Sequence, residues 1–165
     1  MVTLGIDPGT AKMGYGLVRE GPNGLCLVDY GVLTTPASQP LPRRLQVLYQ
    51  GLMALIARHK PSYAAVEQLF FAKNARTAFV VGQARGVVLL AAANSDVPVS
   101  EYTPLHVKQA IADYGRGSKF QVQTMVKLLL NLDALPEPDD AADALAIAIC
   151  HINTMKYTRM IGGQQ

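Results

Sequence analysis

The sequence predicts a single α/β domain with a five-stranded mixed sheet, an antiparallel meander on one side, parallel strands on the other, and helices on both faces. Three short apolar runs separated by tight turns come first in the chain. After them, helical repeats alternate with two more strand-like runs, an order that produces parallel crossovers. The chain has 165 residues, half of them hydrophobic, which is enough for one domain with a substantial core.

The turns mark the first three strands. An apolar run over residues 2–7 ends at Pro8-Gly9-Thr10, and a second run resumes over 14–18. A strong turn at Pro22-Asn23-Gly24 leads to a third run over 25–33. Because short turns join neighbouring strands, we expect these three to form the antiparallel meander.

Helices alternate with strands in the rest of the chain. Leucines at helical spacing predict a helix over 41–59, which Pro61 ends. Two strands at 63–67 and 97–102 are separated by a helix of about 75–93. We expect further helices from Pro104 to about 113, over 119–130, and after the proline-rich segment 136–138. Residues 1–155 are assigned to the domain and 156–165 to a flexible C-terminal tail.

Composition excludes several classes of protein. The sequence contains no apolar run that could span a bilayer without a charge, so we expect no membrane partner. Cys26 and Cys150 are isolated, and we interpret them as reduced thiols in a cytoplasmic protein. Residues 73–130 carry seven Lys or Arg against three Asp or Glu. This basic stretch suits an enzyme that acts on a polyanion, although ordinary surface lysines explain the charge equally well.

Four carboxylates lie at the margins of buried elements. Asp7 ends the first strand and Glu67 ends the fourth, while Asp140 and Asp143 are three apart and share a face of the last helix. A carboxylate beside a core must find a cation or stay neutral, so the four acids indicate a site for a hard cation. Helix capping is the alternative for Asp140, and it is the role that we expect for Asp139.

The glycine-lined turn after Asp7 occurs in two large classes of protein. Ribonuclease H-like nucleases hold metal with this Asp, whereas actin-like kinases cradle a nucleotide phosphate in the turn. The actin-like fold needs two such lobes, and this chain is long enough for one. With the blocks that follow, the chain resembles the RuvC family of Holliday-junction resolvases from about residue 4 to 151. Those blocks are Ala65-Val66-Glu67-Gln68-Leu69-Phe70, Gly82-Gln83-Ala84-Arg85-Gly86, Val107-Lys108-Gln109 and Asp140-Ala141-Ala142-Asp143-Ala144-Leu145-Ala146.

The resemblance implies a ribonuclease H-like fold, a homodimer and paired magnesium-dependent nicks in four-way DNA junctions during recombination and repair. It assigns Asp7, Glu67, Asp140 and Asp143 as catalytic, metal-binding acids, with Asp140 standing where some relatives have a His. We expect two Mg²⁺ ions at each site, with Mn²⁺ able to replace them, and a branch-migration complex as a further partner. Another ribonuclease H-like nuclease, acting on RNA–DNA hybrids or other branched nucleic acid, remains the alternative.

The resemblance also implies DNA-binding residues. Lys108 and Lys119 occupy positions of basic residues near the cleaved strand, and Phe70 matches an aromatic residue associated with disturbing base stacking. Lys73 and Arg76 are candidate phosphate contacts, each of which could equally be a solvated charge.

A dimer seam is expected on the helix of residues 75–93. Gly82 and Gly86 lie four apart on one face with Phe79, which permits close approach of another helix. Tight packing on the chain's own sheet is the alternative. A junction has two strands to cut, and a two-fold dimer would present two sites to them.

Overall fold

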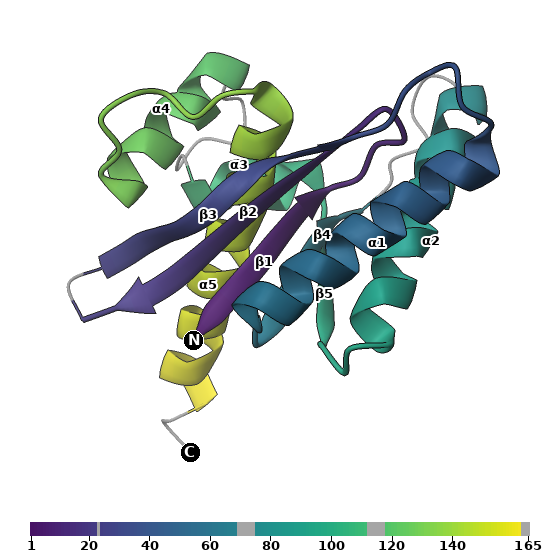
Figure 1. Ribbon diagram of the computed structural model, residues 1–165. Helices are drawn as coiled ribbons and strands as arrows, with labels where there is room; N and C mark the ends of the chain where they lie inside the picture. The colour runs from purple at the N-terminus through teal and green to yellow at the C-terminus, as the bar shows by residue number, and fades with distance from the viewer. Residues whose placement is uncertain (23, 69–74, 112–117, 163–165) are drawn as a thin grey trace.

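A computed structural model describes residues 1–22, 24–68, 75–111 and 118–162 (Figure 1). Its sheet has the order β3-β2-β1-β4-β5, so β1 (Val2–Asp7) is the central strand. β2 (Lys12–Gly21) and β3 (Gly24–Thr34) extend it as an antiparallel meander, whereas β4 (Tyr63–Glu67) and β5 (Val99–Tyr102) are parallel to β1. The expected mixed sheet is therefore confirmed.

Helices cover both faces of the sheet (Figure 1). α1 (Leu41–His59) and α2 (Ala75–Ala93) pack on one face, over Leu4 and Ile6 of β1. α5 (Asp139–Gly162) runs along the other face, where α3 (Pro104–Ile111) and α4 (Lys119–Leu130) pack against it. Two hydrophobic cores result, one on each side of the sheet.

Glycines allow α5 to lie unusually close to the sheet. A Cβ added at Gly5 of β1 would overlap the carbonyl oxygen of Ala144, and one at Gly14 of β2 would overlap that of Asp140. Only glycine leaves space for a helix backbone at these two positions. The first turns of α5, which carry Asp140 and Asp143, are thereby set directly over the strand ends.

Several element bounds differ from those expected, and two of the differences have consequences for the fold. β5 begins at Val99 rather than at residue 97, because the Val97 N–H donates to the Ala92 carbonyl and completes the turn after α2. α5 continues to Gly162, so residues 156–162, expected in a flexible tail, are helical. The division into one domain and a tail stays a prediction, and residues 163–165 lie outside the described part. No helix within the described ranges is both long and apolar enough to cross a membrane.

Candidate active site

The alternation of side chains along neighbouring strands brings Asp7 and Glu67 together. Gly5 faces α5 and Ile6 faces the opposite core, so Asp7 faces α5 again. On β4, Ala65 packs in the α5 core and Val66 in the other, which puts Glu67 on the α5 side as well. Ile6 and Val66 are paired in the parallel register, and each acid follows directly after its paired residue. The two carboxylates therefore leave adjacent strands at the same edge.

The first turns of α5 bring Asp140 and Asp143 to the same place. Asp7 is paired with Gly14 across β1 and β2, and Gly14 lies against the backbone of Asp140. The carboxylate of Asp7 is close enough to Glu67, Asp143 and Asp140 that all three raise its pKa. Three separate elements thus deliver four acids to one end of the sheet.

Burial and mutual repulsion raise the pKa values of three of these acids. For Asp7, burial is the larger cause and the charges of Glu67, Asp143 and Asp140 add to it, which raises its pKa to about 7. The pKa values of Glu67 and Asp143 are also raised, again mainly by burial. Desolvation rather than repulsion is the dominant cause for all three. A bound divalent cation would oppose both causes by favouring the charged carboxylates.

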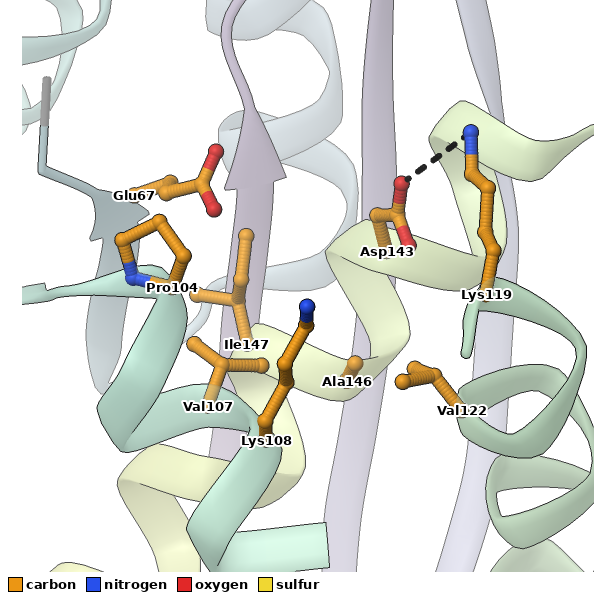
Figure 2. A pocket seen from close by; sticks show the side chains of 9 residues that line it. All are labelled: Glu67, Pro104, Val107, Lys108, Lys119, Val122, Asp143, Ala146 and Ile147. Atoms are coloured by element: carbon orange, nitrogen blue, oxygen red, sulfur yellow. Dashed lines mark ion pairs between the residues drawn. The ribbon is translucent and has the colours of Figure 1, made fainter. Parts of the chain in front are cut away.

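Two lysines lie beside the acids. A cavity of about 320 Å³ is lined by Glu67 and Asp143 together with Lys108 of α3 and Lys119 of α4. Figure 2 shows both lysine side chains directed toward the end of the cavity that holds the carboxylates. The Lys108 charge partly offsets the raised pKa of Glu67, and the Lys119 Nζ lies 3.7 Å from the Asp143 Oδ2. The resemblance implied that both lysines lie near the cleaved strand, and the structure places them beside the acids.

Asp139 has a contact that sequence reasoning missed. It is the first residue of α5, and we expected its carboxylate to cap that helix. Instead, Oδ1 accepts a hydrogen bond from the Gln123 Nε2 at 2.8 Å, and Oδ2 lies 3.0 Å from the Lys119 Nζ. The Lys119 contact lowers the pKa of Asp139. Asp139 therefore ties α4 to α5 and holds Lys119 at the mouth of the site, a long-range contact without any local sequence signal.

Some expected residues are not brought together. Within the described ranges, no three Asp, Glu, His or Cys side chains converge closely enough to hold one ion between them. Phe70 and Lys73 lie outside the described residues, and the side chain of Arg76 is likewise not described. The donor set is nevertheless made only of carboxylates, which is the chemistry that Mg²⁺ and Mn²⁺ prefer.

One face of α2 is uncovered by the rest of the described chain. Phe79 is 69% exposed and Leu90 is 54% exposed. A Cβ added at Gly86 would meet no atom within 4 Å, so this glycine does not serve packing on its own sheet. The expected seam of Phe79, Gly82 and Gly86 stays a prediction.

The strand order and the helices on both sides of the sheet define the class as ribonuclease H-like. The family model described as crossover junction endodeoxyribonuclease RuvC matches residues 3–151. The chain therefore belongs to the RuvC family. Its curated relatives include the proteins of Desulfitobacterium hafniense, 56% identical over 163 residues, and Chloroflexus aurantiacus, 58% identical over 162 residues. The alignments cover 99% and 98% of this chain, respectively, and 99% of each relative.

Solved structures agree with this assignment. Thermus thermophilus RuvC is 36% identical, with a TM-score of 0.89 over 96% of this chain and 97% of that one. The same protein in complex with a Holliday junction substrate is 38% identical, with a TM-score of 0.89 over 97% and 96% of the two chains. The family's nucleases are metal-dependent.

Proposed function

We propose that this chain resolves Holliday junctions by paired, symmetric nicks, in recombination and DNA repair. As a RuvC-family protein it is a crossover junction endodeoxyribonuclease. The observation that carries the proposal is the delivery of Asp7, Glu67 and Asp143 to one edge, with Lys108 and Lys119 beside them.

The four acids would hold the metal ions that phosphodiester hydrolysis needs. A pair of Mg²⁺ ions, when bound, would stabilise the charge that develops on the attacking and leaving oxygens and would supply the water nucleophile. Asp7, which is central in the sheet, would hold these ions together with Glu67 and Asp143. Asp140 would complete the set of carboxylate ligands.

The basic residues would position the DNA. Lys108 and Lys119 would contact phosphates of the cleaved strand and neutralise their charge. Asp139 would keep Lys119 in place without covering its ammonium group, because the Lys119 side chain stays 57% exposed. Phe70 would stack on a base at the crossover, and Lys73 and Arg76 would add phosphate contacts.

A homodimer would present two such sites to the two strands of a junction, with α2 at the seam. We also propose a branch-migration complex as a partner. Cys26 and Cys150 are free thiols, which suits a reducing cytoplasm.

Incubation with a mobile four-way junction and Mg²⁺, with the cuts mapped on all four strands, tests the function. We expect symmetric nicks in two opposed strands, and no comparable cutting of a linear duplex or an RNA–DNA hybrid of the same sequence. Equal cutting of the hybrid would favour the other ribonuclease H-like activity.

The metal requirement is tested on the same substrate. Mn²⁺ should replace Mg²⁺, whereas Ca²⁺, with its looser geometry, should support junction binding with little cutting. Activity in excess EDTA would contradict the metal-dependent mechanism.

A further inference from the structure

A second hollow adjoins Asp140 and is separate from the cavity that Lys108 and Lys119 line. It is bounded by the loop between β1 and β2 and by α2, has a volume of about 520 Å³, and is lined by Gly9, Thr10, Ala11, Lys12, Val80, Val81 and Asp140. A neighbouring hollow of about 550 Å³ is lined by Lys12 and by residues 137–140. Lys12 and Asp140 line both hollows, so a third lysine, at the start of β2, stands beside the acids.

Lys12 is exposed, and its charge acts on the nearby Asp139 carboxylate. Among the ion pairs of the described residues, Lys119 takes part in two, whereas Lys12 takes part in none. Glu137, Asp139 and Asp140 are nevertheless near enough to line the same hollow, which makes the electrostatic setting favourable for an ammonium group.

The backbone that presents Lys12 is held by hydrogen bonds from outside the loop. The Thr35 N–H donates to the Ala11 carbonyl at 3.0 Å, and the Thr35 hydroxyl donates to the Thr10 carbonyl. The Arg44 Nε donates to the Thr35 hydroxyl oxygen at 2.8 Å, which fixes the orientation of that hydroxyl. A loop that is already fixed loses less conformational entropy when a ligand binds to it than a mobile loop does.

The chemistry of the hollow matches a nucleotide. A lysine ammonium group binds a phosphate as a point charge, and Val80 with Val81 offers an apolar wall to a deoxyribose. A DNA strand that crosses the acids carries a phosphate on each side of the scissile one. Lys108 and Lys119 line the cavity of Glu67 and Asp143, whereas Lys12 lines the hollow of Asp140.

We propose that Lys12 binds a phosphate that flanks the scissile phosphate beside Asp140, with the intervening sugar in the hollow against Val80 and Val81. The cleaved strand is then held by Lys12 in addition to Lys108 and Lys119. This inference rests on the proposed junction-cutting function, because only a strand threaded across the acids brings a phosphate to Lys12.

Junction binding with Ca²⁺ in place of Mg²⁺, measured over a salt series, gives the first test. Lys12→Met should weaken binding roughly eightfold at 0.1 M salt and reduce the slope of log affinity against log salt by about 0.9, as for one lost phosphate contact. Arg19→Met is the matched control, since Arg19 is also exposed on β2 but near its far end, and it should change neither quantity. Lys12→Arg should keep most of the affinity.

A junction with one neutral methylphosphonate gives the second test. Wild-type protein should lose affinity when the neutral group replaces the flanking phosphate. Lys12→Met protein already lacks that contact, so the same replacement should not lower its affinity further. If the neutral group lowers the junction affinity of Lys12→Met protein equally at every phosphate position, then Lys12 only offsets the charge of the nearby acids. That result would overturn the proposal. A Lys12→Met protein with the same junction affinity and salt slope as Arg19→Met would also overturn it.

The wild-type reaction separates this inference from the proposed function. If wild-type protein does not cut the junction in Mg²⁺, the proposed function fails and the inference fails with it. If wild-type protein cuts and Lys12→Met behaves like the control, only the inference fails. Circular dichroism of each variant checks that it is folded.

Discussion

The carboxyl group of Asp7 gives the stability of the protein a definite pH dependence. Its pKa in the folded protein is raised from 3.8 to about 7, so the folded state holds an extra proton between these two values. Without metal, the free energy of unfolding should therefore fall as pH rises from about 4 to 7, with smaller contributions of the same sign from Glu67 and Asp143. Asp7→Asn should be more stable than wild type at pH 8 by about 1–3 kcal/mol, measured by urea unfolding in EDTA. A destabilised variant would contradict this prediction.

Asp7 should also separate cutting from binding. Asp7→Asn should abolish junction cutting in Mg²⁺, while junction affinity stays equal or improves because one negative charge near the phosphates is gone. Asp133→Asn, which changes an exposed acid of the α4–α5 connection, should cut normally. Wild-type cutting by the Asp7 variant would remove that residue from the site.

The Asp7 carboxylate should make the Mg²⁺ concentration needed for cutting depend on pH. Because a proton and a metal ion compete for the Asp7 carboxylate, the Mg²⁺ concentration needed for half-maximal cutting should rise as pH falls below about 7. Cleavage rates measured over a metal series at several pH values would show this. A metal requirement that is constant from pH 6 to 8 would count against Asp7 as a ligand.

At the scale of elements, the approach of α5 to the sheet should control both stability and catalysis. Gly14→Ala would push a methyl group into the Asp140 backbone and should lower the free energy of unfolding by about 1–3 kcal/mol or more. It should also lower cutting by displacing Asp140 and Asp143 from Asp7. Gly162→Ala, at the open end of the same helix, is the control and should change neither. Normal cutting by a folded Gly14→Ala protein would show that this contact does not position the acids.

The elements that the sequence predicted well are those with local signals. Pro61 ends α1 close to its observed last residue, and the Pro8–Thr10 and Pro22–Gly24 turns separate the meander strands. β2 and β3 are longer than expected, because pairing with a neighbouring strand stabilises residues whose own sequence gives little strand signal. The four acids could be found because each ends a strand or lies in the first turns of α5. The Asp139–Lys119 contact and the position of Lys12 could not, since the fold alone brings those residues beside the acids.

At the scale of the whole molecule, the uncovered face of α2 should form the dimer seam. Gly86→Leu should fill the open space at Gly86 and dissociate the dimer, since overpacking a seam costs about 1–3 kcal/mol. The monomer should stay folded but lose paired nicking. Sedimentation together with circular dichroism measures both. Wild-type protein that is monomeric at micromolar concentration would rule out this seam.

Binding of the whole junction should depend on salt through the lysines and not through the aromatic residue. Lys108→Ala should reduce the slope of log affinity against log salt, because one phosphate contact and its released counterions are lost. Phe70→Ala should lower cutting with the slope nearly unchanged, since a stacking group releases no counterions. A flattened slope for Phe70→Ala would contradict its stacking role.

The glycines beneath α5 have a consequence for how variants of this protein are interpreted. Gly5 and Gly14 touch helix backbone, so even the smallest added side chain meets atoms that cannot rotate away. A saturation screen scored by survival of DNA damage would find these positions as intolerant as Asp7 itself, although neither has a side chain with which to hold an ion or a base. Positions that tolerate no substitution in such a screen would therefore include both the acids and the glycines that position them. The free energy of unfolding of purified protein would distinguish the two groups, because Gly14→Ala should lower it whereas Asp7→Asn should raise it at pH 8.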